Sequence, residues 1–385
     1  MTNLMSNNRD FLINDRRYCN NKKIKHFNMK LPQAKKIKIQ KYEGGLSKIF
    51  GIKNPIKLSS NESALGSSPL ATKSLDFTKK KIYKYPDSNS SLLKKEISKR
   101  FKINSKQVII GSGSDEIISF ACQAFLKPGD EVVVPEFSFL MYRIYAQING
   151  AKVVYAKEDN FKININNILK CISKKTKIVF LANPNNPTGT YLSFKELKML
   201  HQKLPSRILL LVDDAYWEYI EAKDYMSGLK IFKNKKNVLV TRTFSKIYGL
   251  ASLRLGWGYA SKSIIQSLLN YKPPFNITTP AEFAGIAALK DTRWINKNIK
   301  HNSFWSKKIF EKLKEKKIKS NMPITNFFLM RFDKQYKADT IFNNFAKYGI
   351  ILRKMKNYNI TNSLRVTVGN AQECKLFINL LDKFF

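Results

Sequence analysis

The alternation of short apolar runs with helical stretches constrains the fold of this chain more than any other feature. From Val108 onward, β-branched runs such as "QVIIG", "DEVVVP", "TKIVFLA" and "RILLLVDD" are separated by amphipathic segments such as Ser193–Lys203. Parallel strands need a long crossover between them, and this crossover is usually a helix. The pattern therefore predicts an α/β fold, with a mainly parallel sheet sandwiched between helices.

The last third of the sequence has a different pattern. Residues Thr278 to Lys316 contain few helix breakers and predict long helices. They are followed by "NFFLMRF", a helical stretch near Ala338–Tyr348, "GIILRKM", "LRVTVG" and a terminal helix. This order predicts a smaller α+β domain beside the large one. Residues 1–40 are rich in Asn and Lys with little periodicity, so we expect a poorly ordered N-terminal arm.

The net charge of +41, from 69 Lys plus Arg against 28 Asp plus Glu, raises the question of a nucleic-acid partner. The lysines are spread along the chain with many Asn and Ile, as expected of an AT-rich coding sequence, and no zinc-finger or RNP-type motif accompanies them. We therefore expect no nucleic-acid partner. A basic field of this size would instead steer anionic, phosphorylated substrates toward the protein.

The compartment follows from features that are missing from the sequence. No apolar run approaches the roughly 18 residues of a membrane span, and the start "MTNLMSNNRDFLINDRR" lacks the pattern of a signal peptide. The four cysteines are widely scattered, with no metal or disulfide spacing. We expect a cytoplasmic protein with no metal and no membrane contact.

Polar motifs follow the predicted strands at the edge where an open parallel sheet binds its ligands. "GSGSDE" (111–116) opens a helix whose free N–H groups suit an anion, although alone it is equally well a simple turn. "NPNNPTG" (183–189) is either a rigid turn or a source of amide side chains. "DDAY" (213–216) places a carboxylate at the end of a buried strand, where it needs a partner unless it only caps a helix.

Together with "LSSNESALGSSP", "YKYPD", "FSKIYGLASLRLGW" and "LRVTVG", these motifs resemble those of the fold-type I aminotransferases, which use pyridoxal 5′-phosphate. The resemblance covers roughly Lys41 to the C-terminus and is greatest to the histidinol-phosphate aminotransferase family within this class. It implies a large cofactor-binding domain at residues 76–284 and a small domain made of residues 41–75 plus 285–385.

The resemblance implies catalytic roles for three residues. Lys246 would bond to the cofactor and later carry a proton, which requires a neutral amine. Asp213 would pair with the pyridine nitrogen, and it is preferred to Asp214 because the family pattern is Asp-x-Ala-Tyr. Tyr216 and Asn186 would donate hydrogen bonds to the phenolic oxygen of the cofactor.

The same resemblance assigns the rest of the cofactor site. The phosphate group would be bound by the start of the "GSGSDE" helix, by a hydroxyl group and by a guanidinium, which suits phosphate better than an ammonium does. An aromatic ring would stack on the pyridine, and a tyrosine would reach across from a second subunit of a homodimer. Ser114 and Asp115 stand at the helix start, Ser245 would supply the hydroxyl group and Arg254 the guanidinium. Phe139 would be the stacking ring, and Tyr85 the tyrosine from the second subunit.

Substrate binding is implied for five residues. Arg365 matches the arginine that binds a substrate carboxylate, and Arg353 matches a phosphate-binding arginine. Tyr42, Asn61 and Asn186 would line the substrate site, with Asn61 near its entrance, although Tyr42, Asn61 and Arg353 are also compatible with purely structural roles.

The implied reaction is the reversible transamination of L-histidinol phosphate with 2-oxoglutarate, giving imidazole-acetol phosphate and L-glutamate, in histidine biosynthesis. Two alternatives share the cofactor motifs. One is an aromatic or broad-specificity amino-acid aminotransferase, and the other is a lyase similar to the threonine-phosphate decarboxylases.

Overall fold

The computed structural model describes residues 37, 39 and 42–385 of the chain, and the elements below belong to the compact unit Ile39–Phe385. Except for residues 37 and 39, the arm predicted at residues 1–40 lies outside the described residues. No described helix is both long enough and apolar enough to cross a lipid bilayer.

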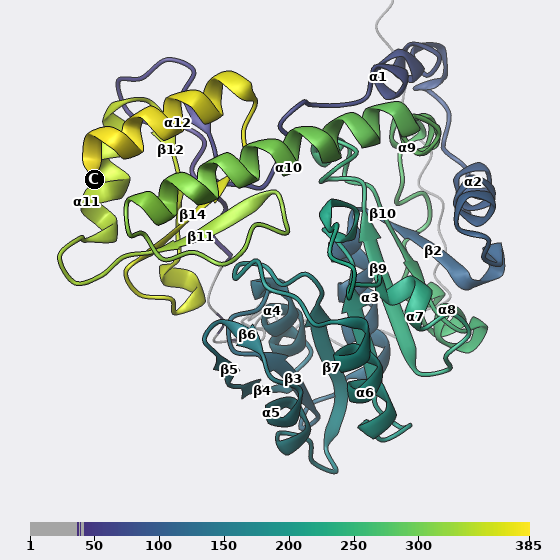
Figure 1. Cartoon of the computed structure of the whole chain (residues 1–385). Helices are drawn as coiled ribbons and strands as arrows, with labels where there is room; N and C mark the ends of the chain where they lie inside the picture. Colours follow the sequence, from purple (N-terminus) through teal and green to yellow (C-terminus); the bar gives the residue numbers. More distant parts are fainter. Residues whose placement is uncertain (1–36, 38, 40–41) are drawn as a thin grey trace, which may run out of the picture. The chain divides into compact units, whose positions relative to one another are not determined.

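A seven-stranded sheet forms the centre of the larger part of this unit (Figure 1). Every strand in it runs parallel to the others except β10, which is antiparallel to both of its neighbours. In spatial order the strands are β2 (Val108–Gly111), β10 (Gly256–Tyr259), β9 (Val238–Thr243), β8 (Leu209–Asp213), β7 (Thr176–Ala182), β3 (Glu131–Pro135) and β4 (Lys152–Ala156). The predicted α/β class and the mainly parallel sheet are confirmed.

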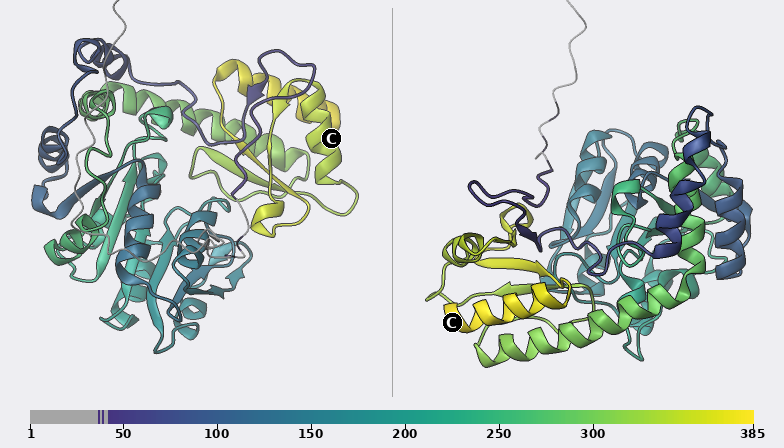
Figure 2. Two further views of the ribbon diagram at one scale, coloured as in Figure 1. Left: turned by 180° about the vertical axis from the view of Figure 1, so that it is seen from behind. Right: turned by 90° about the horizontal axis from the view of Figure 1, so that it is seen from above.

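Alternate residues of the central strands enter two separate hydrophobic cores, as the two-residue period of a strand requires. In β8, Leu210 belongs to one core and Leu211 to the other. The Leu211 core is covered by α3 (Ser114–Phe125), α4 (Leu140–Ile148) and α8 (Lys262–Leu269). The Leu210 core is covered by α2 (Ser91–Phe101), α5 (Ile165–Lys170), α6 (Phe194–Lys203) and α9 (Thr279–Lys290). The sheet is thus sandwiched between helices, which Figure 2 shows from two further directions.

The C-terminal elements form a second layer of sheet and helix around a core of their own. Its three-stranded antiparallel sheet has the order β11 (Phe327–Arg331), β14 (Ser363–Thr367) and β13 (Arg353–Lys354). Helices α10 (Thr292–Glu315), α11 (Ala338–Lys347) and α12 (Ala371–Phe384) pack around this core. An early segment joins them, because β1 (Ile56–Lys57) pairs in parallel with β12 (Ile350–Ile351).

Helix α10 connects the core that contains Leu210 to the C-terminal core. Ile295, near the start of α10, packs in the core of the seven-stranded sheet, whereas Trp305 packs in the C-terminal core. The N-terminal segment makes the same transition, since Leu58 lies in the C-terminal core and Ala71 in the larger one. Ala71 belongs to α1 (Pro69–Asp76), which packs against α9.

The predicted strands and helices are present with small shifts of their ends. Helix α6 begins where the sequence predicts it, because Ser193 and Glu196 form a reciprocal capping box. The remaining elements are short: β5 (Glu158–Asp159) pairs with β6 (Lys162–Ile163), and α7 (Gly228–Ile231) precedes β9. Strand β10 is the one member of the central sheet that the sequence does not predict.

Candidate active site

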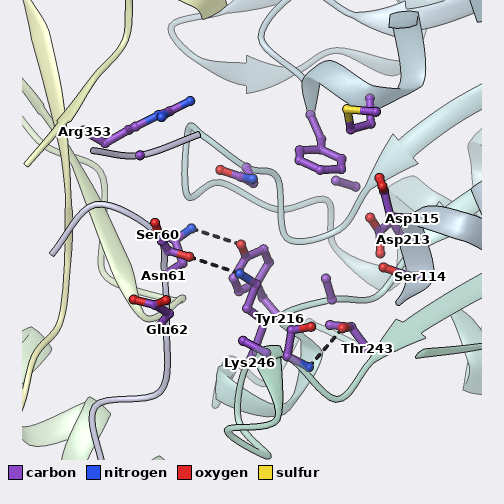
Figure 3. Close-up of a pocket in the computed structure, with 18 of the residues that line it drawn as sticks. Ser60, Asn61, Glu62, Ser114, Asp115, Asp213, Tyr216, Thr243, Lys246 and Arg353 are labelled. Carbon is purple, nitrogen blue, oxygen red and sulfur yellow. Dashed lines mark hydrogen bonds between the residues drawn. The ribbon is translucent and has the colours of Figure 1, made fainter. Parts of the chain in front are cut away.

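A cavity of about 470 Å³ lies at the carboxyl ends of the central strands. Its wall includes the last residues of three neighbouring parallel strands, Ala182 of β7, Asp213 of β8 and Thr243 of β9. Thirteen of the site residues predicted from the sequence line it: Tyr42, Asn61, Ser114, Asp115, Phe139, Asn186, Asp213, Tyr216, Ser245, Lys246, Arg254, Arg353 and Arg365. They come from segments far apart in the chain, and Figure 3 shows how several of them surround one space.

Tyr85 is the predicted site residue that the structure does not bring into the cavity. Its side chain is 84% exposed and its ring stacks on Phe275, with a centroid distance of 4.8 Å. Within its own chain, Tyr85 therefore lies on the surface and not in the wall of the cavity.

Lys246 follows β9 and extends its amine into the cavity. The Nζ atom lies 3.3 Å from the backbone oxygen of Ser60 and 5.6 Å from the centre of the Tyr216 ring (Figure 3). Burial lowers the pKa of Lys246 to about 8, and the positive charge of Arg365 acts in the same direction. A larger fraction of this amine is therefore neutral near physiological pH than for an ordinary lysine.

Asp213 and Asp214 have separate environments because successive side chains of a strand point to opposite sides. Asp213 faces the cavity, and burial raises its pKa to about 6 against the effect of two hydrogen bonds. Asp214 accepts hydrogen bonds from the backbone N–H groups of Gly228 and Leu229 and pairs with Arg242 at 3.3 Å. Its side chain does not line the cavity.

Tyr216 lies beside the lysine and is held by an amide. Asn61 donates a hydrogen bond from its Nδ2 atom to the Tyr216 hydroxyl at 3.0 Å. Burial raises the pKa of Tyr216 to about 12, while Arg365 opposes this shift. Asn61 is itself only 1% exposed. It therefore lies inside the wall of the cavity, deeper than the entrance position expected from the sequence.

One end of the cavity is built to approach an anion closely. Gly113, the N-cap residue of α3, has φ +82°, and a Cβ atom there would collide with the Arg254 guanidinium. A Cβ atom at Gly256 would collide with the backbone nitrogen of Ser114. Because both residues are glycines, the start of α3, the Arg254 guanidinium and the Ser245 hydroxyl can all face the same space. The Nη1 atom of Arg254 lies 3.4 Å from the Oγ atom of Ser245.

The opposite wall carries two arginines on facing strands. Arg353 of β13 is the direct antiparallel partner of Arg365 of β14, so their side chains leave the sheet on the same face. Arg365 donates to the Oδ1 atom of Asn186 and to the backbone oxygen of Ser59, and Arg353 donates to the backbone oxygen of Glu43. Burial lowers the pKa of Arg353. Two guanidinium groups in one wall can bind either two anionic groups or one group of double charge.

Several lining residues are absent from the sequence prediction. Ser59, Ser60 and Glu62 lie beside Asn61 in the motif "LSSNESALGSSP". The others come from the end of β1, from α4, from the end of β9 and from the 3-10 helix Lys356–Tyr358: Lys57, Met141, Tyr142, Thr243 and Tyr358. Glu62 and Lys57 could have been found from their nearness to Asn61, and they form an ion pair at 2.8 Å. Tyr142 could not, because in the sequence it belongs to an apolar helix face. Among the described residues, no group of three His, Cys, Asp or Glu side chains could hold a metal ion.

Comparison with known proteins identifies the family of the chain. Residues 53–381 match the sequence model of the family "Aminotransferase class I and II", which is most of the chain. The chain belongs to this family.

Two curated relatives that the chain resembles carry the same activity in their names. The chain is 54% identical over 359 residues to the histidinol-phosphate aminotransferase of Pelagibacter ubique, covering 93% of this chain and all of the relative. It is 40% identical to the enzyme of the same name from Paramagnetospirillum magneticum, over 90% of this chain and 96% of that protein.

The solved structures agree on the fold. A histidinol-phosphate aminotransferase from Sinorhizobium meliloti, in complex with pyridoxal-5′-phosphate, superposes with a TM-score of 0.79 at 22% identity, over 85% of this chain and 90% of that one. The crystal structure of a putative histidinol-phosphate aminotransferase from Erwinia carotovora atroseptica gives 0.81 at 24% identity, over 86% of this chain and 96% of that one.

Proposed function

We propose that this chain catalyses the reversible transfer of an amino group between L-histidinol phosphate and 2-oxoglutarate, in histidine biosynthesis. The observation that carries the proposal is the 54% identity to a histidinol-phosphate aminotransferase along 93% of the chain. Arg353 and Arg365 in the cavity wall also support the proposal, because both substrates are anions that guanidinium groups can bind.

The cofactor is pyridoxal 5′-phosphate, and the residues present fit it. The anion end of the cavity has the open backbone at Gly113 and Gly256 that a bound phosphate group requires. Ser114, Ser245 and Arg254 would hold the phosphate, and Asp213 would accept a hydrogen bond from the protonated ring nitrogen. When bound, the cofactor supplies an electron sink for the carbon that loses its proton.

The other groups of the cavity act on the substrate or on the ring of the cofactor. Lys246, with its lowered pKa, is the base that removes the proton from the carbon bearing the amino group. Tyr216 and Asn186 would donate hydrogen bonds to the phenolic oxygen of the cofactor, and Phe139 would cover the ring. Asn61 would keep the Tyr216 hydroxyl in place through the 3.0 Å hydrogen bond.

The two arginines would divide the anionic groups of the two amino donors. Histidinol phosphate has a phosphate but no carboxylate, whereas glutamate has two carboxylates. We assign the phosphate to Arg353, aided by Tyr42, and the α-carboxylate of glutamate to Arg365. Both donors can then use one cavity without moving either arginine.

Replacing Arg353 tests this assignment. Losing a charge-assisted contact to the phosphate should lower kcat/KM for histidinol phosphate about 30- to 1,000-fold in Arg353→Ala, with a smaller loss for glutamate. Lys354→Ala is the matched control, because Lys354 is the next residue of β13, does not line the cavity and pairs with Asp339 on the surface. An equal loss for phosphorylated and unphosphorylated donors would instead favour an aromatic or broad-specificity aminotransferase. Release of carbon dioxide from threonine phosphate would favour the lyase.

We further propose a homodimer in which Tyr85 reaches the phosphate site of the other subunit. The support is a set of exposed large apolar side chains in the two segments that contain Tyr85 and its ring partner Phe275, residues 77–92 and 271–275, because exposed apolar side chains gathered in this way are typical of an interface. They are Phe77, Ile82, Tyr83, Leu92, Tyr271 and Phe275.

The division into a large domain and a small one is likewise a proposal. It is supported by the separation of the core around Leu210 of the central sheet from the C-terminal core. Leu58 and Trp305 pack in the C-terminal core, whereas Ala71 and Ile295 pack in the core of the central sheet. The chain would therefore pass from one domain to the other between Leu58 and Ala71 and, within α10, between Ile295 and Trp305. We also propose the cytoplasm as the compartment, in keeping with free thiols at Cys122, Cys171 and Cys374 among the described residues.

A further inference from the structure

Tyr142 is a buried tyrosine whose hydroxyl the proposed chemistry does not use. It lies on α4 with no exposed surface, and its hydroxyl donates a hydrogen bond to the Oδ2 atom of Asp213 at 2.9 Å. The Thr241 hydroxyl of β9 donates to the other oxygen, Oδ1, at 3.1 Å. Each carboxylate oxygen of Asp213 is thus fixed by one neutral donor from a different element.

The ring of Tyr142 has little freedom to move. It stacks on Phe180 of β7 with a centroid distance of 5.1 Å and an interplanar angle of 8°. It also makes an edge-to-face contact with Phe139, the proposed cover of the cofactor ring, with a centroid distance of 5.6 Å and an interplanar angle of 82°. One side chain therefore contacts both the carboxylate and the aromatic ring that would face the cofactor.

We propose that Tyr142 is a positioning residue, whose hydroxyl, together with that of Thr241, keeps the Asp213 carboxylate ionised and turned toward the cavity. Hydrogen bonds donated to a carboxylate stabilise its charged form, and burial favours its neutral form. Both act on Asp213, where burial raises the pKa to about 6 and the bonds from Tyr142 and Thr241 lower it. This inference deepens the proposed function and rests on it, because Asp213 matters only if the cofactor binds there.

The other titratable groups around Asp213 do not replace these donors. Asp214 and Asp115 are carboxyl groups that raise the Asp213 pKa further. Lys246 approaches from the segment after β9 and interacts with Asp213 through its charge. The remaining neighbour, Tyr216, donates no hydrogen bond to it among the bonds found in the described residues.

Helix α4 offers a matched comparison one turn further along. The hydroxyl of Tyr145 donates to the Oδ2 atom of Asp115 at 2.8 Å, so it is a second phenol that binds a carboxylate of the same cavity. A third such pair lies elsewhere, where Tyr191 donates to Asp224 at 2.7 Å outside this cavity. Changing each of these three tyrosines to Phe removes one phenolic hydroxyl, and only the change at Tyr142 removes a hydrogen bond to Asp213.

The decisive measurement is the protonation of Asp213 itself. The carboxylic acid band in the infrared spectrum is titrated in full-length protein freed of cofactor, and the Asp213→Asn spectrum is subtracted to isolate Asp213. The wild-type midpoint is expected near pH 6. Tyr142→Phe and Thr241→Val should each raise it by about one pH unit. Tyr191→Phe should leave it unmoved, and Tyr145→Phe should not raise it, because Tyr145 acts on Asp213 only through the charge of Asp115. Thr241→Ser should restore the wild-type value.

Kinetics of the cofactor-loaded enzyme give a second readout. Tyr142→Phe should lower kcat about 10-fold and leave the KM for the amino donor within about twofold, with the acid limb of the pH profile displaced upward. A folded Tyr142→Phe protein whose Asp213 midpoint equals that of wild type would overturn the inference. If that variant does not fold, the Thr241→Val and Thr241→Ser pair decides in its place. A wild-type protein inactive with histidinol phosphate would refute the proposed function while the infrared titration still tested the hydrogen bonds.

Discussion

At the scale of single residues, the site is defined by two ionisable groups that burial pushes toward neutrality. Burial lowers the pKa of Lys246 to about 8 and raises that of Asp213 to about 6. An amine that acts as nucleophile and base must lose its proton, and a carboxylate that faces a ring nitrogen must keep its charge. Near pH 7 the second condition is largely met and the first is met by a fraction of the molecules.

The Lys246 pKa predicts how the cofactor is captured. Because only the neutral amine bonds to pyridoxal phosphate, the rate of covalent capture by cofactor-free protein should rise with pH and level off above about 8, well below the 10.5 of an ordinary lysine. Stopped-flow absorbance measures this rate between pH 6 and 10. Lys57→Ala, which removes another lysine of the cavity wall, should keep the capture reaction, and Lys246→Ala should abolish it. Capture that persists without Lys246 would assign the bond to another lysine.

The two neighbouring aspartates should fail in different ways. Asp213→Asn should lower kcat about 100- to 1,000-fold without changing the unfolding transition, because it removes a charge from the reacting centre. Asp214→Asn should lower the free energy of unfolding by about 3 kcal/mol, because it leaves the buried Arg242 without its counter-charge. Urea denaturation and steady-state kinetics on both variants separate the two effects. The reverse pattern would mean that Asp214 is the residue facing the cofactor.

At the scale of secondary-structure elements, the site depends on where strands end and helices begin. Asp213 ends β8, Thr243 ends β9, and Ser114 begins α3, so three element boundaries meet at one cavity. Glycines make this meeting possible. Gly256 of β10 lies directly against the start of α3, where a Cβ atom would collide with the backbone of Gly113 and Ser114.

Substituting Gly256 tests whether the helix start binds the phosphate. Gly256→Ala should displace the first turn of α3 and weaken binding of pyridoxal phosphate about 10- to 100-fold, because the colliding atoms are backbone and cannot rotate away. Gly44→Ala is the control, since no atom lies within 4 Å of the added carbon. Fluorescence titration of cofactor-free protein gives both affinities. Unchanged affinity in a folded Gly256→Ala protein would place the phosphate elsewhere.

The same scale explains what the sequence could and could not predict. The strands with continuous β-branched runs, such as Val132–Val134, were predictable because they are buried on both faces. Strand β10 was not, because two of its four residues are glycines and its sequence reads as a turn. Its place between β2 and β9 depends on contacts between segments far apart in the chain.

The candidate site shows a similar division. Motif residues such as Lys246 and Arg365 were predictable because the resemblance covers them. Tyr142 was not, because its hydroxyl gains a role only when α4 packs over the end of β8. The burial of Asn61 was missed for the same reason, since its partners Tyr216 and Thr367 lie 155 and 306 positions further along the chain.

At the scale of the whole molecule, the single chain leaves Tyr85 outside its own cavity. A homodimer would place this side chain, and the apolar surface around it, against a second copy. Closed twofold symmetry would then give each active site residues from both subunits.

Mixing two inactive variants tests this arrangement. A Tyr85→Ala subunit paired with a Lys246→Ala subunit forms one site that lacks both residues and one that retains both. Random exchange should therefore recover about a quarter of wild-type activity. Activity assays before and after exchange, with the mixed dimer confirmed by native mass spectrometry, give the answer. Mixed dimers without recovered activity would mean that Tyr85 acts within its own chain or in no active site.

The central claim is that the cavity selects a phosphorylated amino donor. The most direct test is kcat/KM of the wild-type enzyme for L-histidinol phosphate and for L-phenylalanine, with 2-oxoglutarate as acceptor. Binding of the phosphate by Arg353 predicts at least about a 100-fold preference for histidinol phosphate, the equivalent of one charge-assisted bidentate contact. Equal values for the two donors, or a preference for phenylalanine, would contradict the account.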